Sequence, residues 1–159
     1  MKTNGLPTGT KQKDNKMAKN TLGTILIVDD NTINRLLLNI SFKDSPYKLI
    51  DAGDGKDALK KLKANNDIDI ILLDLNMPFM DGYDFLNYIN TAPLLKQLPL
   101  QVIIVTASRL IEFNATVAKR NINTDRVVKF FTKPLELSDV KTLVDQLMQV
   151  KYKKNEEQR

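Results

Sequence analysis

Four short apolar runs, each followed by a polar residue, constrain the fold of this chain more than any other feature of its sequence. The runs are rich in Val, Ile and Leu and cover residues 24–28, 68–73, 102–105 and 127–131. Near-continuous runs of this length are typical of strands that are buried on both faces of a parallel sheet. The polar residues that follow the runs are, in chain order, Asp29 and Asp30, Asp74, Thr106 and Lys133.

Segments in which apolar residues recur at helical spacing lie between these runs. We expect helices over residues 31–42, after Asp54, after Asp81, over 108–119 and over 137–152, and a further strand over 47–52. Asp54 and Asp81 are suited to cap two of these helices, because a carboxylate accepts hydrogen bonds from the free N–H groups of a first turn. Five strands alternating with five helices predict one doubly wound α/β domain of the flavodoxin-like class, with a parallel sheet of order 2-1-3-4-5.

That strand order places the polar residues at one edge of the sheet. In open parallel sheets the ligand site lies outside the carboxyl ends of the strands, and here the first strand lies beside the third. Asp29, Asp30 and Asp74 should therefore converge, although two like charges 4 Å apart repel by about 4 kcal/mol at an effective dielectric near 20. A hard divalent cation (Mg²⁺, Mn²⁺ or Ca²⁺) would offset that repulsion, since carboxylate-only ligands favour these ions over zinc.

The same residues suit chemistry on a phosphoryl group. An ionised aspartate can attack phosphorus to give an acyl phosphate, and phosphoryl transfer depends mainly on positioning and on neutralising the phosphoryl oxygens. We therefore expect Asp74 to be the nucleophile, with Lys133 holding one oxygen and Thr106 donating a hydrogen bond to another. Taken singly, each residue also fits a structural role such as a helix cap or a solvated lysine, and only their common position at strand ends favours a site.

Composition excludes several other classes of site. The 159 residues include no Cys and no His, which excludes disulfides, thiolate metal sites, serine–histidine catalysis and a phosphohistidine on this chain. Neither a Walker nor a Rossmann glycine motif is present. No apolar stretch approaches the roughly 20 residues of a membrane span, and no secretory signal follows the N-terminal lysines, so a cytoplasmic protein is expected.

The formal net charge of +5 is concentrated at the two ends of the chain. Residues 1–20 carry +4 and residues 151–159 carry +2, which leaves −1 for residues 21–150. A basic groove for nucleic acid is therefore not expected on the folded part. We predict a disordered leader or linker over residues 1–22, a domain over 23–150, and a helix end with a polar tail over 151–159.

At these polar residues the chain resembles the receiver domain of two-component response regulators. The resemblance rests on the acidic pair in ILIVDDN, on Asp74 in IILLDLNMPFMDGYDFL, on Thr106 in IIVTAS and on Lys133 in FFTKP, and it extends over about residues 23–150. The segment DDNTINR also resembles the first-helix entry of receivers attached to hybrid histidine kinases. The chain departs from the family pattern in its long segment 108–126, in the missing Gly-Ala before the last strand, and in having no effector domain after the last helix.

The resemblance implies a chemical role for each matching residue at the acidic end of the site. Asp74 would be the phosphorylated residue. Asp30 would bind Mg²⁺ (or Mn²⁺) directly, and Asp29 would bind it directly or through water. The backbone carbonyl of Asn76 would be a further metal ligand.

It also implies how the signal enters and leaves the domain. Thr106 and Lys133 would contact the phosphoryl group, and Phe130 would rotate inward as Thr106 moves toward the phosphate. The histidine-bearing partner would dock on four apolar residues, although ordinary core packing is an equal alternative for Leu36. These residues are Ile33, Leu36, Pro134 and Leu135.

The expected function is a phosphorylation-dependent switch that accepts a phosphoryl group from a histidine kinase or a histidine phosphotransfer protein. The phosphorylated domain would act on a downstream protein that the sequence does not identify. Such a domain is not expected to be an enzyme, because it catalyses only its own phosphorylation and dephosphorylation. One alternative is an aspartate phosphatase of the haloacid-dehalogenase type, which usually has a proton-donating acid at the position that Asn76 occupies here. The other alternative is a pseudo-receiver that binds partners without phosphorylation, but such domains typically lack the acceptor or the acidic pair.

Overall fold

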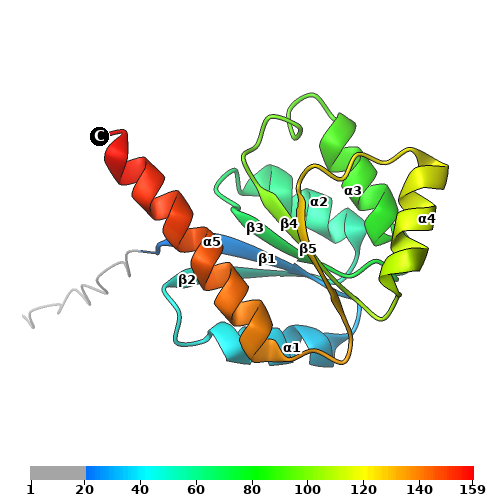
Figure 1. Ribbon diagram of the computed structural model, residues 1–159, viewed down its shortest axis with the longest axis horizontal. Coiled ribbons are helices and arrows are strands. Elements are labelled where there is room, and N and C mark those ends of the chain that lie inside the picture. The colour runs from blue at the N-terminus through cyan, green and yellow to red at the C-terminus, as the bar shows by residue number, and fades with distance from the viewer. Residues whose placement is uncertain (1–20) are drawn as a thin grey trace, which may run out of the picture.

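The computed structural model describes residues 21–159 as a parallel sheet with helices on both faces (Figure 1). The strands are β1 (Gly23–Val28), β2 (Tyr47–Ala52), β3 (Ile70–Leu73), β4 (Gln101–Thr106) and β5 (Val127–Thr132). The helices are α1 (Thr32–Phe42), α2 (Gly55–Ala64), α3 (Gly82–Thr91), α4 (Leu110–Arg120) and α5 (Leu137–Glu157). The strand order β2-β1-β3-β4-β5 confirms the predicted fold class. The leader predicted over residues 1–22 lies almost entirely outside the described residues.

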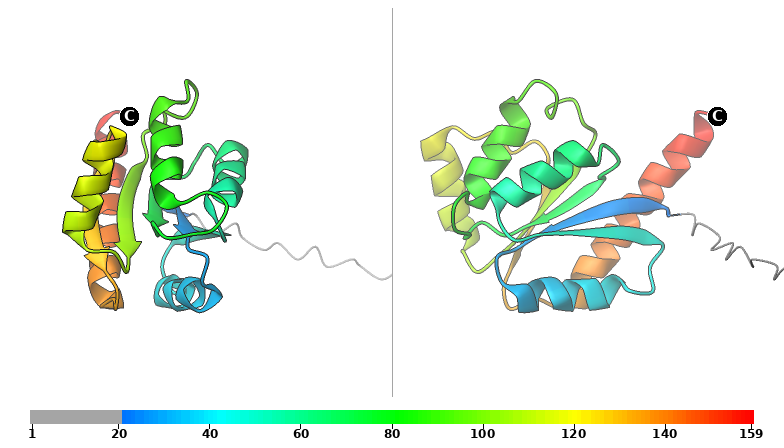
Figure 2. Two further views of the ribbon diagram at one scale, coloured as in Figure 1. Left: turned by 90° about the vertical axis from the view of Figure 1, so that its right-hand side faces the viewer. Right: turned by 180° about the vertical axis from the view of Figure 1, so that it is seen from behind.

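Each central strand supplies two separate cores, because successive side chains of a strand point to opposite faces of the sheet. Ile25 and Ile27 of β1 pack with α1 and α5, whereas Leu26 and Val28 pack with α2, α3 and α4. In Figure 1 α5 lies in front of the sheet, and α2 and α3 come to the front when the molecule is turned by 180° (Figure 2, right). No helix within residues 21–159 has the length and apolar character to cross a membrane.

The predicted helix caps are confirmed. The Asp54 carboxylate accepts hydrogen bonds from the N–H groups of Lys56 (2.7 Å) and Asp57 (2.9 Å), and the Asp81 carboxylate accepts one from Asp84 (2.8 Å). These bonds satisfy donors that a helix leaves free in its first turn.

α1 turns the apolar face expected from its periodicity toward solvent. Ile33 and Leu36 are 61% and 52% exposed, so core packing for Leu36 is wrong. The helix packs instead through Leu38 and Phe42, which are buried against α5 and the sheet. Helical spacing identified the helix but not its inner face, because apolar residues occupy more than one side of it.

Two strands differ from the predicted pattern. β5 lies at the edge of the sheet and keeps Val128 exposed, so burial on both faces is wrong for this strand. β3 begins at Ile70, two residues later than predicted. The reason lies in Asp69, whose carboxylate accepts a hydrogen bond from the Thr24 N–H (2.9 Å) and pairs with Lys151.

Two helices differ at their ends. α4 begins at Leu110, two residues later than predicted, because the Glu112 carboxylate accepts a hydrogen bond from the Arg109 N–H (3.0 Å) and closes the first turn there. It ends at Arg120, and the next residue, Asn121, caps it in the left-handed conformation (φ 52°). α5 continues to Glu157, past the predicted end at Tyr152.

Gly82 is required by a close approach of two backbone segments. A Cβ atom at this position would lie 2.7 Å from the Leu75 Cα and against the Asp74 carbonyl oxygen, so the backbone around Asp74 would have to shift. We predict that Gly82→Ala lowers the free energy of unfolding by about 1–3 kcal/mol, as overpacking does. The measurement is urea unfolding.

Gly53→Ala is the matched control, because the nearest atom to a Cβ there is the flexible Arg35 Nη1 at 3.9 Å. Equal stabilities of the two variants would contradict the packing role of Gly82.

Candidate functional site

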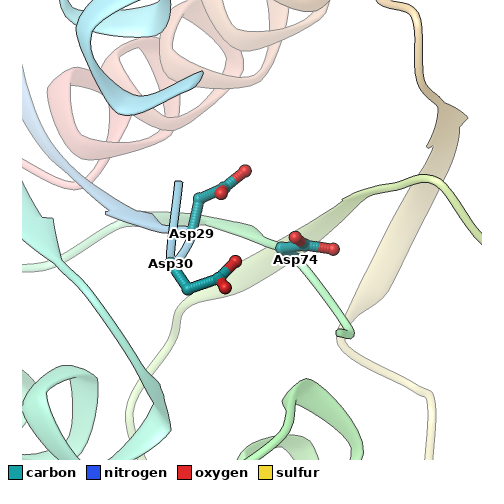
Figure 3. A group of neighbouring side chains, drawn as sticks. All are labelled: Asp29, Asp30 and Asp74. Carbon is teal, nitrogen blue, oxygen red and sulfur yellow. The ribbon is translucent and has the colours of Figure 1, made fainter. Parts of the chain in front are cut away.

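The register of the sheet brings two acidic segments together. Val28 pairs with Leu73, so Asp29 and Asp74 leave adjacent strands side by side, and the Asp74 N–H donates to the Val28 carbonyl (2.9 Å). One carboxylate oxygen from each of Asp29, Asp30 and Asp74 lies within 4.8 Å of the other two (Figure 3). Asp29 and Asp74 are buried, and Asp30 is exposed. The predicted convergence of the three carboxylates is therefore present.

Lys133 reaches this cluster from the end of β5. Its N–H donates to the Thr106 carbonyl (2.7 Å), which fixes the backbone next to β4. Its Nζ donates to Asp29 Oδ2 (2.6 Å) and to Asp74 Oδ2 (3.2 Å). Burial opposes the charged form of Lys133, but the hydrogen bond that its ammonium donates to Asp29 and the charges of both carboxylates outweigh it and raise the pKa of the ammonium above its ordinary value.

The charges of the cluster do not balance. Three carboxylates face one ammonium, and the raised pKa of Lys133 keeps that ammonium charged at every pH below its ordinary range. The oxygen atoms of the cluster are the donors that Mg²⁺ and Mn²⁺ prefer, and their spacing allows one ion to contact more than one carboxylate. The residues present therefore fit a hard divalent cation.

A hydrogen-bonded pair of side chains lies beside Asp74. The Asn76 amide donates to Ser108 Oγ (2.8 Å), which links the loop after β3 to the loop after β4. Thr106 is fully buried at the end of β4, and its hydroxyl accepts a hydrogen bond from the Ser108 N–H (3.3 Å). Thr106 thus lies at the predicted edge of the sheet, with its hydroxyl engaged by the next loop.

The other predicted residues lie in three places outside the cluster. Phe130 lies on β5, half-buried against the core on the side of α2, α3 and α4, with its ring centroid 5.4 Å from that of Phe113 on α4. Pro134 and Leu135 line a cavity of about 250 Å³ that also reaches Asp29 and Lys133. Ile33 and Leu36 lie on the exposed face of α1, outside that lining.

Three residues at the start of α1 hold Asp29 and were not assigned to the site from sequence. The Asn34 amide donates to both Asp29 oxygens (3.3 and 3.2 Å), and the Asn31 N–H donates to Oδ1 (2.8 Å). Arg35 Nη1 donates to the Asp29 carbonyl oxygen (2.7 Å). The segment DDNTINR could have identified these residues. Asn34 and Arg35 lie one helical turn after the Asn31 cap, so their side chains face back toward the end of the strand.

The family model described as "Response regulator receiver domain" matches residues 25–145. The sensor histidine kinase RcsC of Salmonella typhimurium is 42% identical over 110 residues, which cover 69% of this chain and 11% of that protein. The two-component response regulator ORR3 of Oryza sativa is 27% identical over 78% of this chain and 89% of that protein. The chain thus spans about a tenth of the RcsC relatives it matches.

Solved structures show the same architecture. A signal receiver domain from Vibrio parahaemolyticus superposes with a TM-score of 0.68 at 26% identity, covering 84% of this chain and 95% of that chain. The chemotaxis protein CheY4 of Vibrio cholerae superposes with a TM-score of 0.65 at 22% identity, covering 79% and 98%.

The unbalanced charge of the cluster has a measurable consequence. Asp30→Asn removes one of three mutually repelling carboxylates without removing a partner of Lys133. In the presence of a chelator we predict that this variant is more stable than the wild type by about 1 kcal/mol, and that added salt reduces the difference.

Urea unfolding with and without salt measures the effect, and Asp44→Asn, at an exposed turn, is the control. A variant less stable than the wild type would contradict the repulsion.

Proposed function

The chain belongs to the response regulator receiver domain family of two-component signalling, and from that premise we propose that Asp74 accepts a phosphoryl group from a phosphohistidine of a partner protein. The observation that carries the proposal is the convergence of Asp29, Asp30 and Asp74 around the Lys133 ammonium. The RcsC relatives are named sensor histidine kinases, which supports a histidine kinase or a histidine phosphotransfer protein as the donor.

In the proposed transfer an Asp74 oxygen attacks phosphorus as the bond from phosphorus to the partner's imidazole nitrogen breaks. The product is an aspartyl phosphate, and the leaving nitrogen keeps the bonding electron pair. No proton has to be removed from the nucleophile, which is an ionised carboxylate, and no histidine of this chain is needed. Lys133 already touches Asp74 and is positioned to hold a phosphoryl oxygen on the product.

The proposed cofactor is Mg²⁺, with Mn²⁺ as a substitute. Asp30 and Asp29 would hold it, together with an Asp74 oxygen and the backbone carbonyl of Asn76. When bound, the ion supplies positive charge to the phosphoryl oxygens in the transition state. Asn34 and Arg35 act through Asp29, because they fix its carboxylate and its carbonyl.

The proposed switch runs from Thr106 to Phe130. The Thr106 hydroxyl oxygen accepts a long hydrogen bond from the Ser108 N–H (3.3 Å), which leaves its own O–H to donate to a phosphoryl oxygen. Movement of Thr106 would open space at the carboxyl end of β4, and the half-buried Phe130 of the neighbouring β5 can turn into that space. A signalling domain of this kind needs no turnover of an external substrate.

A phosphatase is the less favoured function. An enzyme of the haloacid-dehalogenase type usually has an acid two residues after the nucleophile, and Asn76 holds an amide there that donates to Ser108. A pseudo-receiver is also less favoured, because the acceptor and both acids of the pair are present together.

Incubation of the chain with acetyl phosphate and Mg²⁺ tests the function. We predict an acid-stable, base-labile phosphoryl adduct, detected by intact-mass spectrometry, that is absent from Asp74→Ala and from samples treated with a chelator. An adduct that persists in Asp74→Ala, or none in the wild type with metal present, would contradict the proposal.

The exposed face of α1 is proposed to receive the histidine-bearing partner, next to Pro134 and Leu135. Ile33 and Leu36 are exposed and belong to neither of the two core clusters, so their substitution leaves the core intact. We predict that Leu36→Asp slows phosphorylation by a phosphorylated histidine phosphotransfer protein by about tenfold or more, as loss of an interface anchor does, and leaves phosphorylation by acetyl phosphate unchanged.

Leu110→Asp, at an equally exposed leucine of α4, is the control. Equal slowing with both donors would assign Leu36 to the chemistry instead of docking.

A further inference from the structure

A second surface lies at the opposite end of the sheet from Asp74. All strands run parallel, so the loop before β4 lies at the edge remote from the carboxyl ends. Between α2, α3 and this loop is a cavity of about 460 Å³, here called the α2–α3 cavity. Its apolar lining is Tyr88, Ala92, Pro93, Leu94, Leu95 and Leu98, and its polar lining is Lys63 and Asn66. Figure 2 (right) shows α2 and α3 side by side, with the loop after α3 at the top.

Large apolar side chains of this cavity are open to solvent. Leu94 is 83% exposed and Tyr88 is 39% exposed. Apolar side chains that are exposed together around a cavity typically mark interaction sites. They are not explained by core packing, since the neighbouring Leu95 and Leu100 already anchor the loop in the core.

Arg126 and Leu95 hold the loop between α3 and β4 in place. Arg126, at the residue before β5, donates from Nη2 to the carbonyl oxygens of Leu95 (3.0 Å) and Lys96. Leu95 is 5% exposed and packs in the core between the sheet and α2, α3 and α4. The cavity is therefore preformed, which lowers the entropic cost of binding a partner there.

The charge beside the cavity has one sign. Lys63 lines the cavity and Lys60 lies one helical turn earlier on the exposed side of α2, and neither forms an ion pair within residues 21–159. Lys63 Nζ lies 5.3 Å from the centroid of the Tyr88 ring and no acid lines the cavity.

The two acids nearest to Lys60 and Lys63 in the sequence bond to other groups and form no ion pair with either lysine. Asp57 accepts a hydrogen bond from the Gly53 N–H (3.3 Å), and Asp67 accepts one from the Thr24 hydroxyl (3.1 Å). The α2 lysines are therefore available for negative charges on a partner.

We propose that the α2–α3 cavity docks an acidic segment of a partner protein, which places an apolar side chain in the cavity and its carboxylates along the α2 lysines. The apolar lining favours protein over nucleic acid, because phosphate contacts would use the lysines and leave Leu94 and the cavity open to water. Since the cavity lies at the far edge of the sheet from Asp74, docking is independent of phosphorylation.

Selection of a random peptide library on the immobilised full chain tests the proposal. The selected peptides are expected to combine several Asp or Glu residues with a Leu or Phe. Their affinity, measured by fluorescence anisotropy, is expected to fall about tenfold or more on Leu94→Ser and on the double variant Lys60→Glu, Lys63→Glu. These residues are exposed, so the substitutions leave the core intact.

Matched variants place the same changes elsewhere. Lys119→Glu and Leu110→Ser alter exposed residues of α4 and are expected to leave the affinity unchanged. Asp74→Asn is expected to bind like the wild type, which separates this proposal from the function of the acidic site.

Selected peptides without acidic residues would overturn the proposal, and so would peptides that bind Leu94→Ser as tightly as the wild type. Binding of a duplex oligonucleotide that falls with the lysine variant but not with Leu94→Ser would assign the lysines to nucleic acid and overturn it as well.

Discussion

The bridge from the Lys133 ammonium to Asp29 and Asp74 is the interaction on which the site depends. Asp29 is 2% exposed and Asp74 is 6% exposed, and two buried carboxylates this close repel strongly. Lys133 touches both, and the raised pKa of its ammonium follows from that double contact. One ammonium offsets only one of the three negative charges, and the proposed cation would offset the rest.

The scaffold serves this cluster by fixing its backbone. Parallel pairing of β1 with β3 sets Asp29 beside Asp74, and pairing of β4 with β5 sets Lys133 beside Thr106. Side chains from α1 then orient Asp29, and the absence of a side chain at Gly82 lets α3 start against the Asp74 backbone. The carboxylates come from segments far apart in sequence, so their geometry is a property of the sheet rather than of any one loop.

The sequence predicted the fold and the cluster because both depend on strands that end in polar residues. Runs buried on both faces identify the central strands, and strand order alone places Asp29, Asp30 and Asp74 together. The sequence predicted less well the features that depend on tertiary contacts. Apolar residues occur on several sides of α1, so periodicity did not show that Leu38 and Phe42 face inward. The late start of β3 depends on Asp69 bonding to Thr24, a contact between residues 45 positions apart.

An NMR titration with a paramagnetic metal ion, which shows where on the chain the ion binds, tests the central claim most directly. Substoichiometric Mn²⁺ added to the isotope-labelled chain should broaden the amide signals of Asp30, Asp74 and Asn76 first, and excess Mg²⁺ should restore them. Asp30→Asn should lose this effect. Equal broadening at exposed acids such as Asp44 and Asp125, or no recovery with Mg²⁺, would contradict the claim that these carboxylates form a single cation site.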